Sequence, residues 1–233
     1  MANENENMPS PIVPPQKSST VSLLEVTLVM IVTFVLFLFI GGALYLLNIA
    51  VALVVSELLL LIVPLTYLLF KRINVKSYIG AEFKPKFFLV GIGLGIVLLF
   101  IDVLISATLT TVFGTSQTVE ETNRIITDLS KSPTGLIAVV ASLSLAGICE
   151  EFVFRGFLQS TINRRYSFLP AVFVSAAVFG LAHFDPQLVY TLSAFIIGLF
   201  LGFVYHRWNS YVVSATAHST VNIIVLITLL LAL

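Results

Sequence analysis

From residue 21 onward the chain alternates long apolar runs with short polar stretches. A helix that crosses a bilayer needs about 20 mostly apolar residues, and most of these runs reach that length with only isolated charges inside them. The pattern therefore predicts an all-α, polytopic integral membrane protein with about seven transmembrane helices. The expected segments are about 21–47, 49–70, 87–113, 134–159, 168–184, 187–205 and 211–233.

The polar stretches set the expected organisation of the chain. Residues 1–20 are rich in Asn, Glu, Pro and Ser, which is typical of a disordered tail. Residues 114–133 mix apolar side chains with charged ones and predict a short helix at the membrane interface. We expect an N-terminal tail at 1–20, N-terminal transmembrane helices at 21–113 and a second transmembrane unit at 134–233.

The third segment opens with three closely spaced glycines, Gly91, Gly93 and Gly95. Small residues on a helix surface let two helices approach each other closely in a membrane. We therefore expect this part of the helix to pack tightly against a neighbour.

Composition supports the membrane assignment and narrows the partners. The chain is 58% hydrophobic and only 10% charged, whereas a soluble domain carries about 25% charged residues. The formal net charge is zero, so no basic surface predicts binding to nucleic acid, and membrane lipids are the expected surroundings. The single cysteine, Cys149, excludes an intramolecular disulfide.

The Lys and Arg residues are distributed unequally between the two sides of the predicted bundle. Nine lie in the N-terminal tail and in the second, fourth and sixth loops, and only Arg124 and Lys131 lie on the other side. Cytoplasmic loops carry the excess of positive charge. We therefore expect a multi-pass protein of the cell membrane with a cytoplasmic N-terminus and an outside C-terminus.

The fourth segment carries two carboxylates and one guanidinium, Glu150, Glu151 and Arg155. Ionisable groups inside a membrane are costly and usually functional. Adjacent helical residues point about 100° apart, so we expect the two glutamates not to face one site. Glu151 and Arg155 are four residues apart and can form an ion pair, which leaves Glu150 as a candidate general base. The alternative is one buried charge cluster without chemistry.

Two histidines lie at or inside apolar segments and form a possible site with Glu150. His183 ends the fifth segment, and His218 shares a helix face with Asn222 in the seventh. Water could be polarised between Glu150 and His183, while His218 and Asn222 could donate hydrogen bonds to an oxyanion. For straight helices, His183 lies about 22 Å from the cytoplasmic end, against about 13 Å for Glu150 and about 11 Å for His218. The site therefore needs a tilted or deeply set fifth helix.

Three motifs occur in order, one per segment: Glu150-Glu151-x-x-x-Arg155, Phe179-x-x-x-His183 and His218-x-x-x-Asn222. Together they resemble the CAAX-protease and bacteriocin-processing family of polytopic intramembrane endopeptidases, over about residues 134–226. The CAAX branch of that family removes the last three residues of a prenylated Cys-a-a-X tail.

The resemblance implies that residues 134–233 form a catalytic core acting on peptide or protein substrates, prenylated tails among them. Glu150 would activate water held by His183, His218 and Asn222 would stabilise the oxyanion, and Glu151 and Arg155 would orient the site. No cofactor is favoured, and in a zinc-dependent alternative Glu150, His183 and His218 would bind the metal. We expect the site to open toward the cytoplasmic half.

Other residues keep different interpretations open. Glu57 and Asp102 are further intramembrane acids that could share a proton or line a water-filled cleft, as in a proton-coupled transporter. A non-catalytic membrane scaffold of the same fold is a third possibility. Cys149 neighbours two carboxylates, a setting unsuited to a reactive thiol, so we expect a small buried core residue.

Overall fold

The structure is a computed structural model that describes residues 21–232, and within this range it contains helices and no β-strand. The predicted disordered tail, 1–20, lies outside the described residues. The all-α prediction is confirmed. The helices are α1 (Leu23–Leu36), the π-helical η1 (Phe37–Gly41), α2 (Gly42–Leu47), α3 (Ile49–Phe70), α4 (Val75–Tyr78), α5 (Pro85–Phe113), α6 (Gln117–Ser130), α7 (Pro133–Glu151), the π-helical η2 (Phe152–Gln159), α8 (Ser160–Asn163), α9 (Phe168–Ala182), α10 (Val189–Trp208) and α11 (Tyr211–Leu231).

Six of the seven expected segments form helices that are long and apolar enough to cross a membrane. The remaining one is α9, an apolar helix of 15 residues. It rises about 22 Å, less than the hydrocarbon core of about 30 Å. The polar stretch before α7 forms the predicted short helix, α6.

Short polar residues between the apolar runs start the helices. The Asn48 side chain accepts a hydrogen bond from the Val51 backbone N–H at the first turn of α3. Ser132 and Ser210 do the same at the first turns of α7 and α11. Such caps satisfy N–H groups that have no partner inside the helix, and they explain why adjacent spans are separated by only a few residues.

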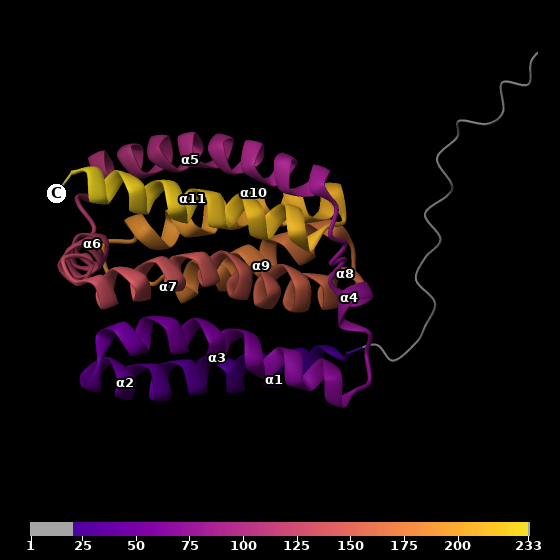
Figure 1. Cartoon of the computed structure of the whole chain (residues 1–233). Helices are drawn as coiled ribbons and strands as arrows, with labels where there is room; N and C mark the ends of the chain where they lie inside the picture. Colours follow the sequence, from indigo (N-terminus) through magenta and orange to yellow (C-terminus); the bar gives the residue numbers. More distant parts are fainter. Residues whose placement is uncertain (1–20, 233) are drawn as a thin grey trace, which may run out of the picture.

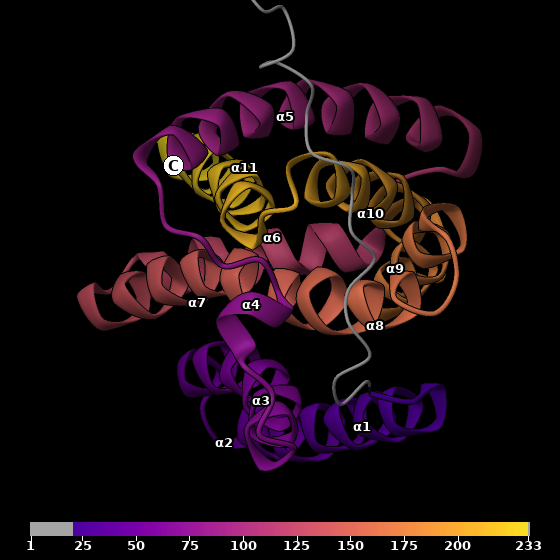
Figure 2. The same cartoon turned by 90° about the vertical axis from the view of Figure 1, so that its right-hand side faces the viewer.

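The helices pack in layers around α7 (Figure 1). Helix α5 runs obliquely over α11 and α10, while α3 and α1 lie on the opposite side of α7 (Figure 2). α9 packs against α10 and against η2. The segment that carries the glutamate pair therefore lies between two groups of helices.

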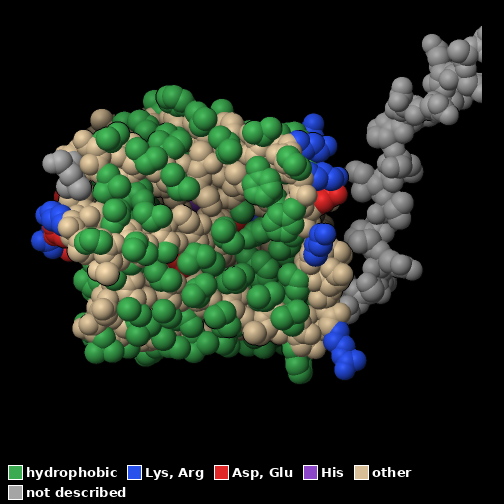
Figure 3. Space-filling view, in the orientation of Figure 1, with side chains coloured by type: hydrophobic (Ala, Val, Ile, Leu, Met, Phe, Trp, Pro, Cys, Tyr) green, Lys and Arg blue, Asp and Glu red, His purple; other side chains and the backbone are tan. Residues whose placement is uncertain are grey.

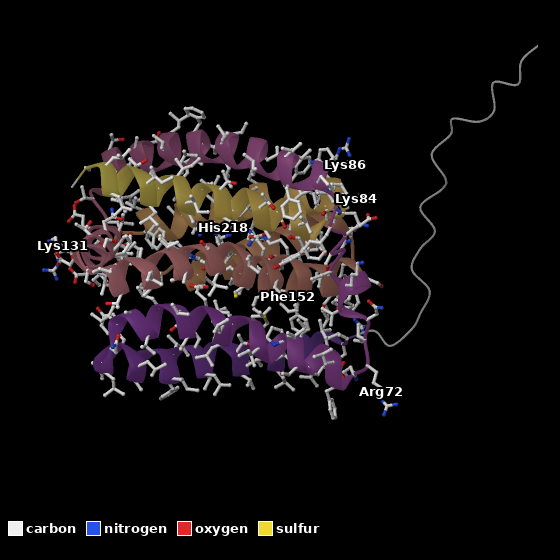
Figure 4. All side chains as sticks on the ribbon, viewed as in Figure 1. Arg72, Lys84, Lys86, Lys131, Phe152 and His218 are labelled. Carbon is white, nitrogen blue, oxygen red and sulfur yellow. The ribbon has the colours of Figure 1, made fainter. Side chains whose placement is uncertain are left out.

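Charged side chains gather at the two ends of the molecule, and the surface between them is largely hydrophobic (Figure 3). Arg72, Lys84 and Lys86 lie at one end and Lys131 at the other (Figure 4). Exposed Phe, Leu, Ile and Val side chains line the spans between these ends. This is the surface expected of a protein surrounded by lipid.

The loops that carry most of the positive charge meet at one end, which we call the basic end. Arg164 Nη2 donates to the Tyr78 carbonyl oxygen at 2.8 Å, and Arg165 Nε donates to that of Val21 at 3.2 Å. The Tyr211 backbone N–H donates to the Gly80 carbonyl oxygen. The basic end thus comprises residue 21 and the connections 71–84, 164–167 and 209–210. The opposite end, at α6 and the C-terminus, is called the α6 end (Figure 1).

Candidate active site

The site forms where α7 passes into the π-helical segment η2. Glu150 and Glu151 end α7, and Arg155 follows in η2, all eight residues of which are buried. π-helical turns are often found at functional sites. His183 directly follows α9, and His218 lies on α11 in the middle of the molecule (Figure 4).

Close packing of α7 on α11 brings His218 to the glutamate pair. Gly147 lies one turn before Glu151, and a Cβ built on it would be only 2.6 Å from the backbone nitrogen of Ser219. No side chain fits at that distance, so glycine is what lets the two backbones approach. Because Ser219 adjoins His218, this contact sets the distance from His218 to Glu150 and Glu151.

The expected ion pair between Glu151 and Arg155 is present and fully buried. Arg155 Nη1 lies 2.8 Å from Glu151 Oε1, and neither side chain is exposed to solvent. Arg155 Nη2 also donates to the Gly198 carbonyl oxygen at 3.1 Å. The guanidinium stacks over the Phe179 ring, with its carbon 4.6 Å from the ring centre. These contacts tie η2 to α10 and to α9.

One sequence expectation about the glutamates is wrong, because both face the same histidine. His218 Nδ1 lies 3.2 Å from Glu151 Oε1, and His218 Nε2 lies 3.9 Å from Glu150 Oε2. The two side chains do leave the helix in different directions. An imidazole, however, has nitrogens on two of its edges, so one ring can reach both carboxylates.

His183 is held in a defined orientation beside Glu150. Its Nδ1 is 2.8 Å from the Phe179 carbonyl oxygen. A carbonyl can only accept, so Nδ1 carries the proton, and in the neutral ring Nε2 is an acceptor. This Nε2 lies 3.9 Å from Glu150 Oε2. The His183 backbone oxygen accepts from Thr191 Oγ1 at 3.2 Å, which fixes the connection to α10.

The expected difference in depth between His183 and Glu150 is reduced by the length of the fourth segment. That segment continues through η2 and α8 to Asn163, beyond the expected end at residue 159. At the rise of an α-helix, Glu150 therefore lies about 20 Å along this segment from Asn163, rather than about 13 Å from its end. This length is similar to that of His183 along α9, which is about 22 Å.

The polar neighbours of Glu150 Oε2 are placed as a bridging water molecule would need them. This oxygen is buried and has no hydrogen-bond partner among residues 21–232. A buried carboxylate oxygen without a partner is costly. The two distances of 3.9 Å to His183 Nε2 and His218 Nε2 are too long for direct hydrogen bonds. A water molecule can nevertheless bridge either pair of atoms, because its oxygen can lie about 2.8 Å from the carboxylate oxygen and about 2.8 Å from the ring nitrogen.

The same donor atoms do not fit a tetrahedral zinc ion as they are placed. Ligand atoms about 2.0–2.1 Å from zinc are about 3.3 Å apart in a tetrahedron, and here each nitrogen is 3.9 Å from the carboxylate oxygen. Among residues 21–232, no group of three or more His, Cys, Asp or Glu side chains is arranged to hold a metal ion.

Three cavities lie around the site, and His183 lines two of them. The first, the apolar cavity, measures about 630 Å³ and is lined by Phe34, Glu57, Thr118, Glu150, His183 and Tyr190 among others. The histidine pocket measures about 110 Å³, and its lining includes Asp102, His183, Tyr190, Ser193, His218 and Asn222. The polar cavity measures about 420 Å³ and shares Asp102, Tyr190, Ser193 and Asn222 with the histidine pocket, with α6 forming part of its wall.

The expectation that the site opens toward the cytoplasmic half stays a prediction. No residue of 71–84, 164–167 or 209–210 lines any of these three cavities. Helix α6 instead lines two of them, the apolar cavity through Thr118 and the polar cavity through residues 119–126. At the basic end, Tyr78 and Tyr205 are buried, and the Tyr205 hydroxyl donates to the Ile79 carbonyl oxygen at 3.0 Å. A further cavity of about 670 Å³ shares Phe34, Leu38 and Val178 with the apolar cavity and reaches Tyr166 at this end.

Asn222 lines the histidine pocket but has a backbone partner. Its Nδ2 donates to the Leu143 carbonyl oxygen at 3.2 Å. An amide nitrogen carries two N–H groups, so one remains for a ligand in the pocket. The predicted oxyanion role of Asn222 stays a prediction.

The remaining candidates have separate environments. Glu57 lines the apolar cavity and Asp102 lines the other two cavities, so each borders a cavity but the two acids do not border the same one. Cys149 is 0% exposed and lines none of the three, in agreement with its expected place in the core.

Sequence reasoning missed the residues that organise the connection between α9 and α10. Asp185 is fully buried and accepts a hydrogen bond from the Tyr190 backbone N–H at 3.2 Å. Its own N–H donates to Thr191 Oγ1 at 2.8 Å. Tyr190 lines all three cavities. An acid just before an apolar run is a helix-cap signal, which could have indicated this role.

A comparison with known protein families found one match. Residues 132–224 match the family described as Rce1-like, type II CAAX prenyl endopeptidase Rce1-like. The matched segment is therefore similar to that family. It contains all six predicted site residues, and the resemblance to CAAX proteases is therefore confirmed over it, which supports a multi-pass membrane protease at the level of the family. No curated protein and no solved structure matches the chain.

Proposed function

We propose that this protein is an intramembrane endopeptidase in which Glu150 and two histidines activate water for peptide hydrolysis. The proposal is carried by one observation: His183 Nε2 and His218 Nε2 both lie 3.9 Å from Glu150 Oε2, an oxygen without a partner among the described residues. The Rce1-like match over residues 132–224 supports the same reaction class.

In the proposed reaction, water binds between Glu150 and His183. Glu150 takes one proton as the water oxygen attacks the peptide carbonyl carbon, and the carbonyl oxygen becomes an oxyanion. His218, when it carries both ring protons, donates through Nε2 to this oxyanion while Glu151 holds its Nδ1. The free N–H of Asn222 is the second donor. The C–N bond then breaks, and Glu150 returns the proton to the leaving amine.

The buried ion pair has a supporting role in this scheme. Arg155 holds Glu151 at 2.8 Å, and Glu151 holds His218 at 3.2 Å. The chain of contacts orients His218 without requiring Arg155 to touch substrate. Arg155 and Glu151 are therefore proposed as positioning residues.

The proposed substrate is a membrane-associated peptide tail with apolar residues near the cleaved bond. Nine of the fourteen residues lining the apolar cavity beside Glu150 have apolar side chains, which suits such residues. A prenylated Cys-a-a-X tail is the candidate that the family description suggests.

The test is cleavage of a peptide library by purified protein reconstituted in lipid vesicles. The library should contain farnesylated and unmodified Cys-a-a-X peptides and other tagged C-terminal tails, with products identified by mass. We expect Glu150→Gln to reduce cleavage by about 10²–10⁴-fold, the usual contribution of a general base. Glu82→Gln, which alters an exposed carboxylate on the loop before α5, is the matched control. Cleavage by folded Glu150→Gln at the wild-type rate would overturn the proposal.

A further inference from the structure

The polar cavity has more polar residues in its lining than the apolar cavity on the other side of His183. Eleven of its seventeen lining residues carry polar side chains, against five of fourteen in the apolar cavity. It lies between α5, α6, α10 and α11. A cavity of this composition inside a membrane protein can hold water, because its walls offer hydrogen-bond partners.

Asp102 is the charged group at the inner end of the polar cavity. Ser193 Oγ donates to Asp102 Oδ1 at 2.7 Å, and Ser106 Oγ lies 3.4 Å from the same oxygen. No ion pair within residues 21–232 includes Asp102. An acid in a long apolar helix, held by two hydroxyls and without a cation, marks a hydrated path more readily than a structural ion pair.

The polar cavity continues into the histidine pocket. Asp102, Tyr190, Ser193 and Asn222 line both, and the pocket also contacts His183 and His218. Its volume of about 110 Å³ has room for about three water molecules at about 30 Å³ each. Polar side chains therefore follow one another from α6 to the two histidines.

Hydrolysis consumes one water molecule for each bond cleaved, and a substrate in the apolar cavity would separate Glu150 from water on that side. We propose that the polar cavity is a water conduit, in which Asp102 and Ser193 keep a hydrated path from the α6 end to His183 and His218. The purpose of the conduit rests on the proposed endopeptidase function. Its existence does not, and it can be measured without any substrate.

The decisive experiment is labelling of introduced cysteines with a small, membrane-impermeant cationic reagent, 2-(trimethylammonium)ethyl methanethiosulfonate. Ser193→Cys places a thiol in the conduit, and Ser175→Cys is the matched control on α9. Both serines are buried, 4% and 1% exposed respectively, but Ser175 lines none of the three cavities. The native Cys149 is 0% exposed, so the wild-type protein supplies the background.

We expect Ser193→Cys to react at least about tenfold faster than Ser175→Cys, because a thiol reacts only where reagent and water reach it. In sealed vesicles, Lys131→Cys and Lys84→Cys mark the two sides of the membrane. The reagent should label Ser193→Cys when it is added on the side where it labels Lys131→Cys, and not when it is added on the side where it labels Lys84→Cys. Equal rates for the two serine positions would overturn the conduit. Labelling of Ser193→Cys from the side of Lys84→Cys alone would also overturn it.

A second experiment tests the contribution of Asp102 to turnover. We expect Asp102→Leu to lower kcat about tenfold with KM for the peptide unchanged, because water supply affects turnover rather than peptide binding. Asp102→Asn, which stays polar, should retain most of kcat. Equal losses in the two variants would indicate a structural role and count against the conduit. The labelling result stands whether or not the protein cleaves peptides, so the two proposals can fail separately.

Discussion

At the residue scale, Glu151 links the buried ion pair to the histidine site. One of its oxygens, Oε1, is 2.8 Å from Arg155 and 3.2 Å from His218. Each glutamate has a buried Oε2 without a hydrogen-bond partner among the described residues. Glu150 differs because it borders the apolar cavity, whereas Glu151 lines none of the three cavities. Two neighbouring carboxylates of one helix thus have different surroundings, and this difference supports different roles in the proposed reaction.

The buried ion pair leads to a stability prediction. Arg155→Met leaves Glu151 in the protein interior without its guanidinium partner, and breaking a buried pair in this way costs about 3–5 kcal/mol. We expect a clear fall in the thermal unfolding temperature in detergent, partly restored by Glu151→Gln in the same chain. Arg124→Met, which breaks an exposed pair on α6, should leave the temperature almost unchanged. Equal unfolding temperatures for Arg155→Met and the wild-type protein would contradict this prediction.

The spacing of the donor atoms leads to a prediction about metal. Because the nitrogens of His183 and His218 are 3.9 Å from Glu150, beyond the about 3.3 Å of a tetrahedral zinc site, we favour the metal-free mechanism. Cleavage should survive treatment with a strong chelator, and the purified protein should contain far less than one zinc per chain. Stoichiometric zinc together with chelator-sensitive cleavage would contradict the metal-free mechanism.

At the element scale, glycines decide which helices meet closely. Gly147 brings α7 onto α11. On α5, a Cβ at Gly95 would lie 2.6 Å from the Ala217 carbonyl oxygen, and one at Gly91 would be 2.5 Å from the Thr216 Cβ, both on α11. Gly93 has nothing within 4 Å. The expectation of close packing is thus confirmed for Gly91 and Gly95 and wrong for Gly93, which lies on a different face of the helix.

This contrast gives a test within one helix. We expect Gly95→Val to destabilise the protein by about 1–3 kcal/mol, because the larger side chain must push α5 away from the backbone of α11. Gly93→Val faces open space and should change stability by less than about 0.5 kcal/mol. Thermal unfolding in detergent compares the two, and similar losses would show that α5 and α11 do not pack as described.

At the scale of the whole molecule, the two ends differ in charge and in access. The basic end collects the loops rich in Lys and Arg, whereas α6 borders the polar cavity at the other end. If the basic end faces the cytoplasm, as the charge distribution predicts, then the water entrance lies on the outer side. That is opposite to the opening expected from the sequence.

The orientation itself is a prediction that labelling of intact cells can check. We expect Lys131→Cys, at the α6 end, to react with an impermeant thiol reagent from outside. Lys84→Cys, at the basic end, should react only after the membrane is permeabilised. The opposite pattern would place the N-terminus outside and return the cavities to the cytoplasmic side.

Much of the candidate site could be predicted because the sequence carries local signals for it. Glu150, Glu151 and Arg155 are conspicuous in an apolar run, and the spacing of Glu151 and Arg155 correctly predicts their ion pair. The bridging position of His218 could not be predicted in this way. It depends on the close contact of two helices at Gly147, which helical periodicity within one segment does not describe.

The sequence by itself determined the helices, their approximate bounds and the residues with unusual chemistry. Apolar length and the cost of buried charge are properties of single segments, and they can be read without neighbours. Only the tertiary structure decided that both glutamates meet His218, that Asp102 and Glu57 border different cavities, and that these cavities extend to the α6 end. These features arise from the packing of oblique helices far apart in the sequence, and no single segment encodes that geometry.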